Sequence, residues 1–400
     1  MPLIRLSIEN YKAFQKKQTI EIKPITLLIG KNSSGKSSIA KLFTLLENSL
    51  SGNISEPLLL ENNNVSLGGE FRDLAFRRLP TTPIIFTLQF AMCEIEVAVL
   101  LEKSDYEVRI LSWNYVSDNF KLRLSYSPTS GYTDETGQTY DCEFGGFIPK
   151  KMILNGEDLV PSLLSTIPTL DVDYIGPFRI LPDRQFHLIG KMEYNKTGVK
   201  GEFAYPILGI SQFLKKDLHT TVGKWYKENF NGWELKVEAS SRPFIEILLE
   251  KNDTSVNIVD VGQGMNQALP LVVRANISKQ NSIIVLEQPE LHLHPAAHAD
   301  LAELFAKSAV QKKQTFIIET HAENFILRLR KLIVENDFGL TKDDVIIYFV
   351  DDCESGGQEI NEITINAEGD LSDWPDNVFN ENVEEIIQIK NAVRRKKEQQ

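Results

Sequence analysis

The residues best suited to chemistry lie in one short loop near the N-terminus, Gly30-Lys-Asn-Ser-Ser-Gly-Lys-Ser37. The loop matches the pattern GxxxxGK(S/T), whose glycines let the backbone wrap an anion and point successive N–H groups at phosphate oxygens. Lys36 adds a positive charge for the β- and γ-phosphates, and the Ser37 hydroxyl is a ligand for Mg²⁺. The sequence therefore predicts a nucleoside triphosphate and Mg²⁺ as ligands. The predicted phosphate contacts are Gly30, Asn32, Ser33, Ser34, Gly35, Lys36, Ser37 and Ser38.

The chain lacks the carboxylate by which GTPases recognise guanine, and this predicts which base the nucleotide carries. GTPases usually recognise guanine through an NKxD element. The nearest match in this chain, Asn195-Lys-Thr-Gly198, ends in a glycine and offers no carboxylate to the base. ATP is therefore the expected nucleotide.

A second group of candidate residues follows two later apolar runs. Ser282–Leu286 predicts a buried strand that ends at Glu287, and a phosphate-loop enzyme needs an acid at such a strand end to hold Mg²⁺. Glu287 is therefore predicted as a metal ligand together with Ser37. Another run, Thr315–Glu319, leads to His321, which could contact the γ-phosphate or the attacking water. The alternatives are a strand-end acid without a function and a structural histidine.

The elements around the phosphate loop are the ones that it requires. Ile25–Ile29 is a continuous apolar run and predicts a buried central strand before the loop. Ser38–Leu50 carries apolar residues at helical spacing, which predicts a helix after it. The N-terminus of such a helix favours a bound phosphate through its exposed N–H groups and its dipole.

The whole chain is predicted to be an α/β protein with a P-loop core around a mixed sheet, interrupted by a β-rich and helical lobe. Short alternating runs between residues 84 and 126 indicate antiparallel strands, and 210–226 indicates a helix. No heptad run is long enough for an extended coiled coil. The predicted parts are 1–50 and 256–350 for the core, 51–255 for the inserted lobe and 351–400 for a tail with a helix over 382–397. Whether the early strands of the insert join the core sheet is left open.

The amino-acid composition argues against several classes of protein. The 43 Lys and Arg against 55 Asp and Glu give a net charge of −12, which argues against binding nucleic acid over the whole surface but leaves a local basic patch open. The cysteines Cys93, Cys142 and Cys353 lie far apart, which excludes a disulfide framework and fits the reducing cytoplasm. No apolar run approaches the roughly 18 residues that a membrane span needs. We therefore expect a cytoplasmic protein without a membrane role.

Several strings together resemble one superfamily, the ABC-type ATPases of the SMC and DNA-repair branch. The closest resemblance is to the bacterial ATPases with overcoming-lysogenisation-defect-like domains. The strings that carry it span most of the chain: Glu287-Gln-Pro-Glu-Leu-His-Leu-His-Pro295, Glu319-Thr-His-Ala-Glu323, Leu67–Leu74, Tyr174–Arg179 and Trp374–Phe379.

The resemblance implies a head-to-tail homodimer that encloses two ATP molecules. Each site would pair the phosphate loop of one subunit with a signature segment of the other. That segment looks like Asp260-Val-Gly-Gln-Gly-Met-Asn-Gln267, with Gly262, Gly264 and Asn266 as the nucleotide contacts. It departs from the LSGGQ form of transporters, which argues against membrane transport. The alternative is an ordinary glycine turn before a core helix.

One departure from the superfamily concerns the chemistry. The residue after the metal-side acid is normally a glutamate that orients or deprotonates water, and here it is Gln288. A glutamine can hydrogen-bond water but cannot accept its proton at neutral pH. Hydrolysis could be slow, Glu290 could take over the acid-base role, or the glutamine could be an introduced substitution. Gln288, Glu290 and His321 are therefore the candidate catalytic residues.

Two further groups of residues were candidates for metal binding. His292, His294 and His298 could form a metal site, although the His-x-His pair is more typical of a loop facing the dimer partner. Asp351-Asp352 faintly resembles a Toprim metal site, but too little chain follows for such a domain, so we expect no built-in nuclease.

The expected function is an ATP-hydrolysing sensor or regulator. The resemblance suggests bacterial anti-phage defence or DNA-related processing, with a separate nuclease or toxin as effector. Higher oligomers and DNA contact are left open. A nucleotide-gated scaffold with little hydrolysis and a DNA-repair ATPase are the alternatives.

Overall fold

The computed structural model describes most of the 400 residues, and the described ranges are 2–79, 81–102, 106–161, 167–188, 194–241, 243–354, 356–374 and 389–390. Apart from residues 389 and 390, the predicted tail helix over 382–397 lies outside them, as does the Trp374–Phe379 string beyond its first residue. Within the part that is described, no helix is long and apolar enough to cross a membrane.

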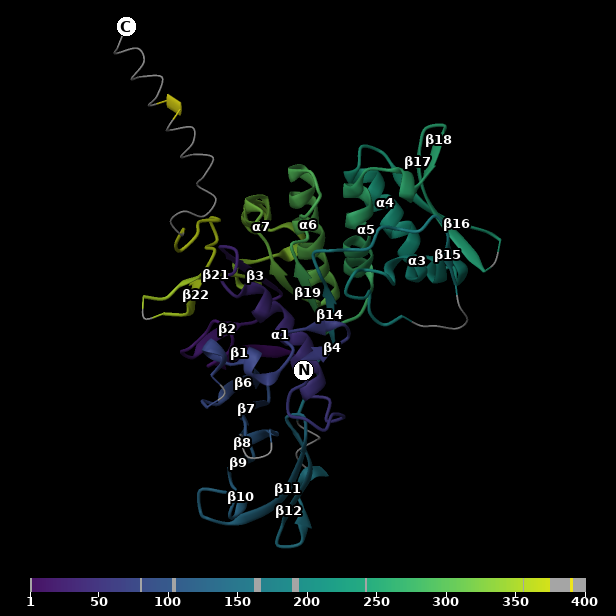
Figure 1. Cartoon of the computed structure of the whole chain (residues 1–400). Coiled ribbons are helices and arrows are strands. Elements are labelled where there is room, and N and C mark those ends of the chain that lie inside the picture. The colour runs from purple at the N-terminus through teal and green to yellow at the C-terminus, as the bar shows by residue number, and fades with distance from the viewer. Residues whose placement is uncertain are drawn as a thin grey trace.

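The centre of the fold is a six-stranded sheet that is parallel except at one edge (Figure 1). Its spatial order is β14 (Val172–Ile175), β19 (Ile283–Glu287), β20 (Thr315–Glu319), β3 (Ile25–Gly30), β21 (Val345–Asp352) and β22 (Gln358–Ile363). Strands β3, β14 and β19 are buried along their whole length, as the continuous apolar runs of β3 and β19 predict. The predicted mixed sheet of an α/β P-loop core is confirmed.

Each face of this sheet is covered by a different group of elements. Helix α1 (Lys36–Ser49) packs on the face that carries Leu28 and Val285, together with the β-rich lobe. Helices α5 (Gln263–Asn276), α6 (Pro295–Lys312) and α7 (Glu323–Glu335) cover the face of Leu27. The two hydrophobic cores therefore divide according to the alternation of side chains along the strands.

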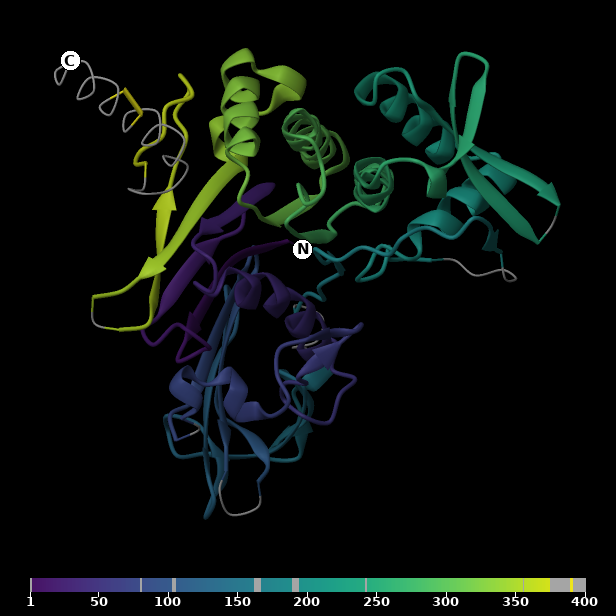
Figure 2. The same ribbon diagram turned by 45° about the horizontal axis from the view of Figure 1, so that its top comes forward.

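A second sheet forms the β-rich lobe, seen below the core in Figure 2. Its ten strands are antiparallel in the order β13-β12-β11-β10-β9-β8-β7-β6-β1-β2. The described strands β6 to β13 of the insert therefore continue a sheet that the N-terminal strands begin, whereas β14, which also lies within residues 51–255, pairs with β19 in the six-stranded sheet. The bounds are β1 Leu3–Glu9, β2 Gln18–Glu21, β6 Ile84–Phe90, β7 Cys93–Leu101, β8 Val108–Ser117, β9 Lys121–Ser127, β10 Gly131–Thr133, β11 Thr139–Gly145, β12 Ile148–Leu154 and β13 Glu157–Asp158.

The helical lobe lies on the side of α5 that is away from the six-stranded sheet (Figure 2). It combines two helices with a small antiparallel sheet. The single helix predicted over 210–226 is wrong, because the backbone turns left-handed at Lys215, with φ 54°, and ends the first helix. The bounds are α3 Ala204–Phe213, α4 Leu218–Asn229, β15 Phe186–His187, β16 Glu234–Ser241, β17 Phe244–Lys251 and β18 Thr254–Asn257.

Short elements complete the described chain. They are the hairpin of β4 (Glu61–Asn62) and β5 (Val65–Ser66) and the 3-10 helices Phe71–Leu74, Phe76–Arg78, Ile258–Asp260, Asp337–Gly339 and Lys342–Asp344.

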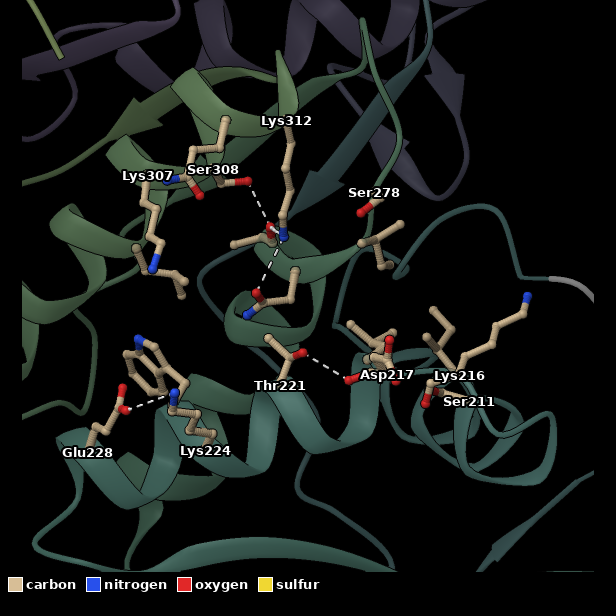
Figure 3. A pocket seen from close by; sticks show the side chains of 18 of the residues that line it. Ser211, Lys216, Asp217, Thr221, Lys224, Glu228, Ser278, Lys307, Ser308 and Lys312 are labelled. Atoms are coloured by element: carbon tan, nitrogen blue, oxygen red, sulfur yellow. Dashed lines mark hydrogen bonds and ion pairs between the residues drawn. The ribbon is translucent and has the colours of Figure 1, made fainter. Parts of the chain in front are cut away.

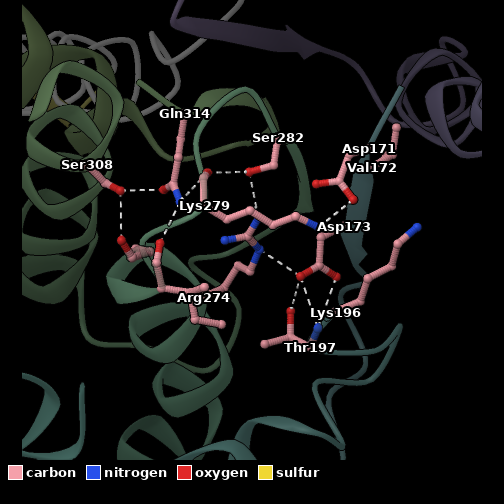
Figure 4. Close-up of polar contacts among 12 residues, drawn as sticks. Asp171, Val172, Asp173, Lys196, Thr197, Arg274, Lys279, Ser282, Ser308 and Gln314 are labelled. Atoms are coloured by element: carbon pink, nitrogen blue, oxygen red, sulfur yellow. Dashed lines mark hydrogen bonds and ion pairs between the residues drawn. The ribbon is translucent and has the colours of Figure 1, made fainter. Parts of the chain in front are cut away.

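A buried ion pair ties α5 to the edge of the central sheet (Figure 4). Nε of Arg274 on α5 lies 2.7 Å from Oδ2 of Asp173 on β14, and their side chains are 2% and 4% exposed. The same carboxylate accepts hydrogen bonds from the backbone N–H and the hydroxyl of Thr197. Arg274 also donates to the hydroxyl of Ser282 at 2.8 Å. The C-terminal half of α5 is therefore held to β14 by a network of charges and hydrogen bonds.

Candidate nucleotide site

The phosphate loop connects β3 to α1, as predicted, and two glycines determine its path. Gly30 has φ +139°, and a Cβ there would lie 2.4 Å from the carbonyl oxygen of Val350. Gly35 has φ +98° and precedes the first residue of α1, and no side chain caps this helix start. The loop therefore leaves the N-terminus of a 14-residue helix available to an anion.

Lys36 lies inside the loop. Its side chain is buried, and Nζ donates to the carbonyl oxygens of Gly30 at 2.9 Å and of Lys31. Burial lowers the pKa of Lys36, while the negative charge of Glu319 acts in the opposite direction. The ammonium group is thus held where the loop backbone and α1 would meet a phosphate chain.

Two carboxylates lie side by side next to this loop. Glu287 ends β19 and Glu319 ends β20, and the two residues are paired in the parallel register. Both residues are buried, at 5% and 4% exposed, and among the described residues Oε1 of Glu287 and Oε2 of Glu319 have no hydrogen-bond partner. The Ser37 hydroxyl donates to Glu319, and the Tyr174 hydroxyl donates to Glu287. Two buried oxygens are therefore free to bind a cation.

The electrostatics of the pair favour a cation as well. Burial and the negative charge of Glu319 together raise the pKa of Glu287 to about 7, against the lowering effect of Lys41. Burial also raises the pKa of Glu319, against the lowering by the Ser37 hydrogen bond. Two carboxylates and a hydroxyl are the hard oxygen donors that Mg²⁺ prefers, so these residues fit the ion that the loop implies.

Glu319 was not among the predicted site residues. The sequence contained a signal for it, because Thr315–Glu319 is an apolar run that ends in an acid, as 282–287 does. What the sequence could not show is that β20 lies between β19 and β3, which brings Glu319 next to Ser37.

The three candidate catalytic residues lie on two neighbouring turns at this edge of the sheet. Gln288 has φ 44°, and its backbone N–H donates to the carbonyl oxygen of Glu319 at 2.8 Å. Oε1 of Glu290 accepts from the backbone N–H of His321 at 2.7 Å, and its Oε2 is buried without a partner in the described part of the chain. Burial and the charge of Lys36 lower the pKa of His321, so its ring is neutral at pH 7.

The predicted signature segment is the start of α5. Gly262 precedes the helix, and nothing lies within 4 Å of the position that a Cβ would take there. A Cβ on Gly264 would lie 3.1 Å from the carbonyl oxygen of His292. Asn266 is only 3% exposed, and its Oδ1 has no hydrogen-bond partner among the residues that the structure describes. The helix start at Gly262 is thus open to a ligand, whereas Asn266 points inward.

A separate cavity of about 1110 Å³ lies between α3 and α4 of the helical lobe and the helices α5 and α6 (Figure 3). Lys312 of α6 lines it and donates to the carbonyl oxygen of Ala275 at 2.8 Å, near the C-terminus of α5. None of the residues that line this cavity belongs to the phosphate loop. This cavity and the candidate nucleotide site are therefore different places.

The histidines after β19 have structural partners. Nδ1 of His294 accepts from the backbone N–H of Ala296 and caps α6, and Nε2 of His298 lies 3.2 Å from the carbonyl oxygen of Leu293. Across the described ranges, no group of three or more His, Cys, Asp or Glu residues could hold a metal ion. The alternative metal site of the three histidines is therefore wrong.

Two family models match the chain. One is described as an AAA ATPase domain and matches residues 1–149 and 207–326. The other is described as a protein of unknown function, DUF3696, and matches residues 340–389. None of the curated proteins matches the chain.

Solved structures with a similar arrangement include SMC head domains. The SMC head domain from Thermotoga maritima is 13% identical, with a TM-score of 0.43 over 90% of this chain and 98% of that one. The SmcHead bound to the C-winged helix domain of ScpA is 15% identical, with a TM-score of 0.48 over 91% and 98%. The Smc head domain with an extended coiled coil, bound to the C-terminal domain of ScpA derived from Pyrococcus furiosus, is 13% identical, with a TM-score of 0.44 over 98% and 100%.

Proposed function

This chain belongs to the AAA ATPase domain family, and we propose that it hydrolyses Mg-ATP between two copies of itself to regulate a separate effector. The observation that carries the ATPase part is the arrangement at one edge of the central sheet. Lys36 and Ser37 of the phosphate loop lie beside Glu287 and Glu319, whose buried oxygens include two without a partner.

The residues of the site divide the work by their chemistry. The loop backbone and Lys36 bind the phosphates, and Ser37, Glu287 and Glu319 are the ligands that would hold Mg²⁺. The ion would neutralise the charge that develops on the phosphate oxygens. Phosphoryl transfer depends mostly on positioning and charge, so a preorganised loop supplies much of the catalysis.

We assign the task of orienting water to Glu290. Gln288 follows the metal-side acid and cannot accept a proton at neutral pH. Glu290 has one oxygen bound to the backbone of His321 and a second oxygen that is buried without a partner. A carboxylate held in this way is suited to accept a hydrogen bond, and then a proton, from water.

A nucleotide-gated scaffold with little hydrolysis is the second candidate, and Gln288 is the observation that favours it. Steady-state phosphate release should separate the two functions. We expect release by the wild type above that of Lys36→Ala and at least about a hundredfold loss in Glu290→Ala. The matched control is Glu135→Ala, which removes an exposed glutamate of the β-rich lobe, and it should behave as the wild type. Phosphate release by the wild type no faster than that of Lys36→Ala would refute the ATPase function and leave the nucleotide-gated scaffold.

The homodimer follows from the resemblance and from the open start of α5. A helix N-terminus with a glycine at its first turn can approach a γ-phosphate through its backbone N–H groups. We expect ATP to convert the wild type to a dimer, or a higher oligomer built from it, as measured by light scattering. Gly262→Asp adds a negative charge at this helix start and should prevent the conversion. An ATP-independent oligomeric state would contradict this arrangement.

The proposed setting is bacterial anti-phage defence in the cytoplasm, with a nuclease or toxin as a separate effector. It is supported by the strings that resemble the overcoming-lysogenisation-defect-like ATPases. DNA repair is the alternative, and stimulation of phosphate release by DNA would favour it. Any DNA contact of a chain with net charge −12 should be local and should weaken steeply with salt.

A further inference from the structure

One arginine connects the predicted signature helix with the turn that carries the candidate catalytic residues. Arg179 lies in the segment between β14 and β15, and its side chain is buried, with the residue 6% exposed. Its Nη1 donates to the carbonyl oxygen of Gln267 on α5 at 3.2 Å. Its Nη2 donates to the carbonyl oxygen of Gln288 at 2.8 Å. A single planar group therefore fixes the distance between the helix and the turn.

The surroundings hold this arginine in place from several sides. The backbone of its segment is tied to a neighbouring loop, because Gly176 N–H donates to Val199 and Ile180 N–H donates to Lys200, at 2.8 and 3.0 Å. The negative charge of Glu290 supports the charged form of Arg179 against the effect of burial, which lowers its pKa to about 10. Among the described residues Arg179 forms no ion pair, and a buried guanidinium without one is costly unless other groups satisfy it, as the two carbonyls do here.

The position of Arg179 matters because of what lies at each end of the bridge. Gln267 is in the first turns of α5, whose open start would contact the nucleotide bound by the partner subunit. Gln288 precedes Glu290, which would act on the nucleotide bound by the same subunit. The bridge therefore joins an element of one ATP site to an element of the other.

We propose that Arg179 is a positioning residue that couples the two ATP sites of the dimer. The inference rests on the proposed function. When ATP of the partner holds the start of α5, the guanidinium transmits that position to the turn of Gln288 and so to Glu290. Occupation of one site then favours the active arrangement of the other, which is positive cooperativity.

The chemistry of arginine makes a conservative variant informative. A guanidinium presents several N–H donors in a rigid plane and can bind two carbonyls that lie on different elements. The ammonium of a lysine has the same charge but is a single point on a flexible chain, so Arg179→Lys keeps the charge and loses the fixed bridge.

The test measures phosphate release against ATP concentration. For two coupled sites the Hill coefficient of the wild type should lie above 1 and reach at most about 2. Arg179→Lys should lower it to about 1, and ATP affinity measured with dilute monomer should stay within about twofold, because the hydrogen bonds of the Arg179 side chain go to Gln267 and Gln288 and not to the phosphate loop. The matched control is Arg328→Lys, a half-buried arginine of α7 that bridges to Asp300 and Glu303 on α6. It should keep the Hill coefficient of the wild type.

Each outcome decides the inference. An unchanged Hill coefficient in a folded Arg179→Lys would overturn it, as would a large loss of ATP affinity in the monomer, since the arginine would then serve the nucleotide directly. If Arg179→Lys fails to fold, Arg179→Gln keeps a donor for one carbonyl and should show the same loss of cooperativity. A wild type without ATP-dependent phosphate release refutes the proposed function instead, and the two failures are thereby distinguished.

Discussion

The ion pair between Asp173 and Arg274 gives the sharpest prediction about stability. The two side chains are 4% and 2% exposed, and their closest atoms lie 2.7 Å apart. Asp173→Ala would leave the Arg274 guanidinium buried, with only the hydroxyl of Ser282 as a hydrogen-bond partner in the cluster (Figure 4). It would also remove the acceptor that the backbone N–H and the hydroxyl of Thr197 share.

The size of the effect follows from what is left behind. Removing one partner of a buried pair costs about 3–5 kcal/mol, because the remaining charge is not compensated. The unsatisfied N–H of Thr197 adds about 1–3 kcal/mol. Folded domains have a total free energy of unfolding of about 5–15 kcal/mol, so Asp173→Ala should be close to unfolding. Asp173→Leu combined with Arg274→Met removes both charges and should therefore cost less than either single change.

Urea unfolding followed by circular dichroism measures these differences. We expect the midpoint to fall in the order wild type, double variant and then the single variants. Glu135→Ala is the control, because it breaks an exposed ion pair with Arg123 and should leave the midpoint unchanged. The reasoning is refuted if Asp173→Ala unfolds within about 1 kcal/mol of the wild type, or if the double variant costs as much as the two single changes together.

Three further predictions concern the site and its support. Gly30→Ala should lower the melting temperature and abolish binding of a fluorescent ATP analogue. The reason is that φ of Gly30 is +139° and that the added Cβ would collide with the carbonyl oxygen of Val350. Normal binding would contradict the loop geometry. Glu319→Gln should raise the Mg²⁺ concentration for half-maximal phosphate release several-fold, and an unchanged Mg²⁺ titration would remove Glu319 from the site. Burial, with Arg274 and Lys307, lowers the pKa of Lys312 from 10.5 to about 8. The folded chain therefore binds fewer protons above pH 8, and from pH 8 to 10 the unfolding free energy of wild type should rise relative to Lys312→Met. Parallel urea curves at the two pH values would exclude this shift.

Local patterns were sufficient for the elements that surround the phosphate loop. The run Ile25–Ile29 predicts β3, which is observed over Ile25–Gly30, because a strand buried on both faces must be apolar throughout. Ile84–Phe90 was predicted as a strand from its alternation and is observed with the same bounds. Both patterns are formed by residues that are close together in the chain. They can therefore be recognised from the sequence alone.

Other features depended on contacts between distant parts of the chain. The helix predicted over 210–226 is interrupted at Lys215, a residue without any strong preference for a left-handed backbone, so no residue type announced the break. The partners of Arg179 are backbone carbonyls at positions 267 and 288, and a carbonyl has no signature in the sequence. Such contacts follow from packing, and packing is a property of the assembled elements.

The amino-acid sequence was enough to predict a phosphate loop with Lys36, Ser37 and one acidic strand, because the chemistry of phosphate binding requires particular residues at short and constant spacing. The fold added Glu319 and the bridge of Arg179, and it gave His294 and His298 structural partners. The difference has a physical cause. Backbone wrapping around an anion is a local event, whereas the meeting of two carboxylates depends on the order in which separate strands enter one sheet.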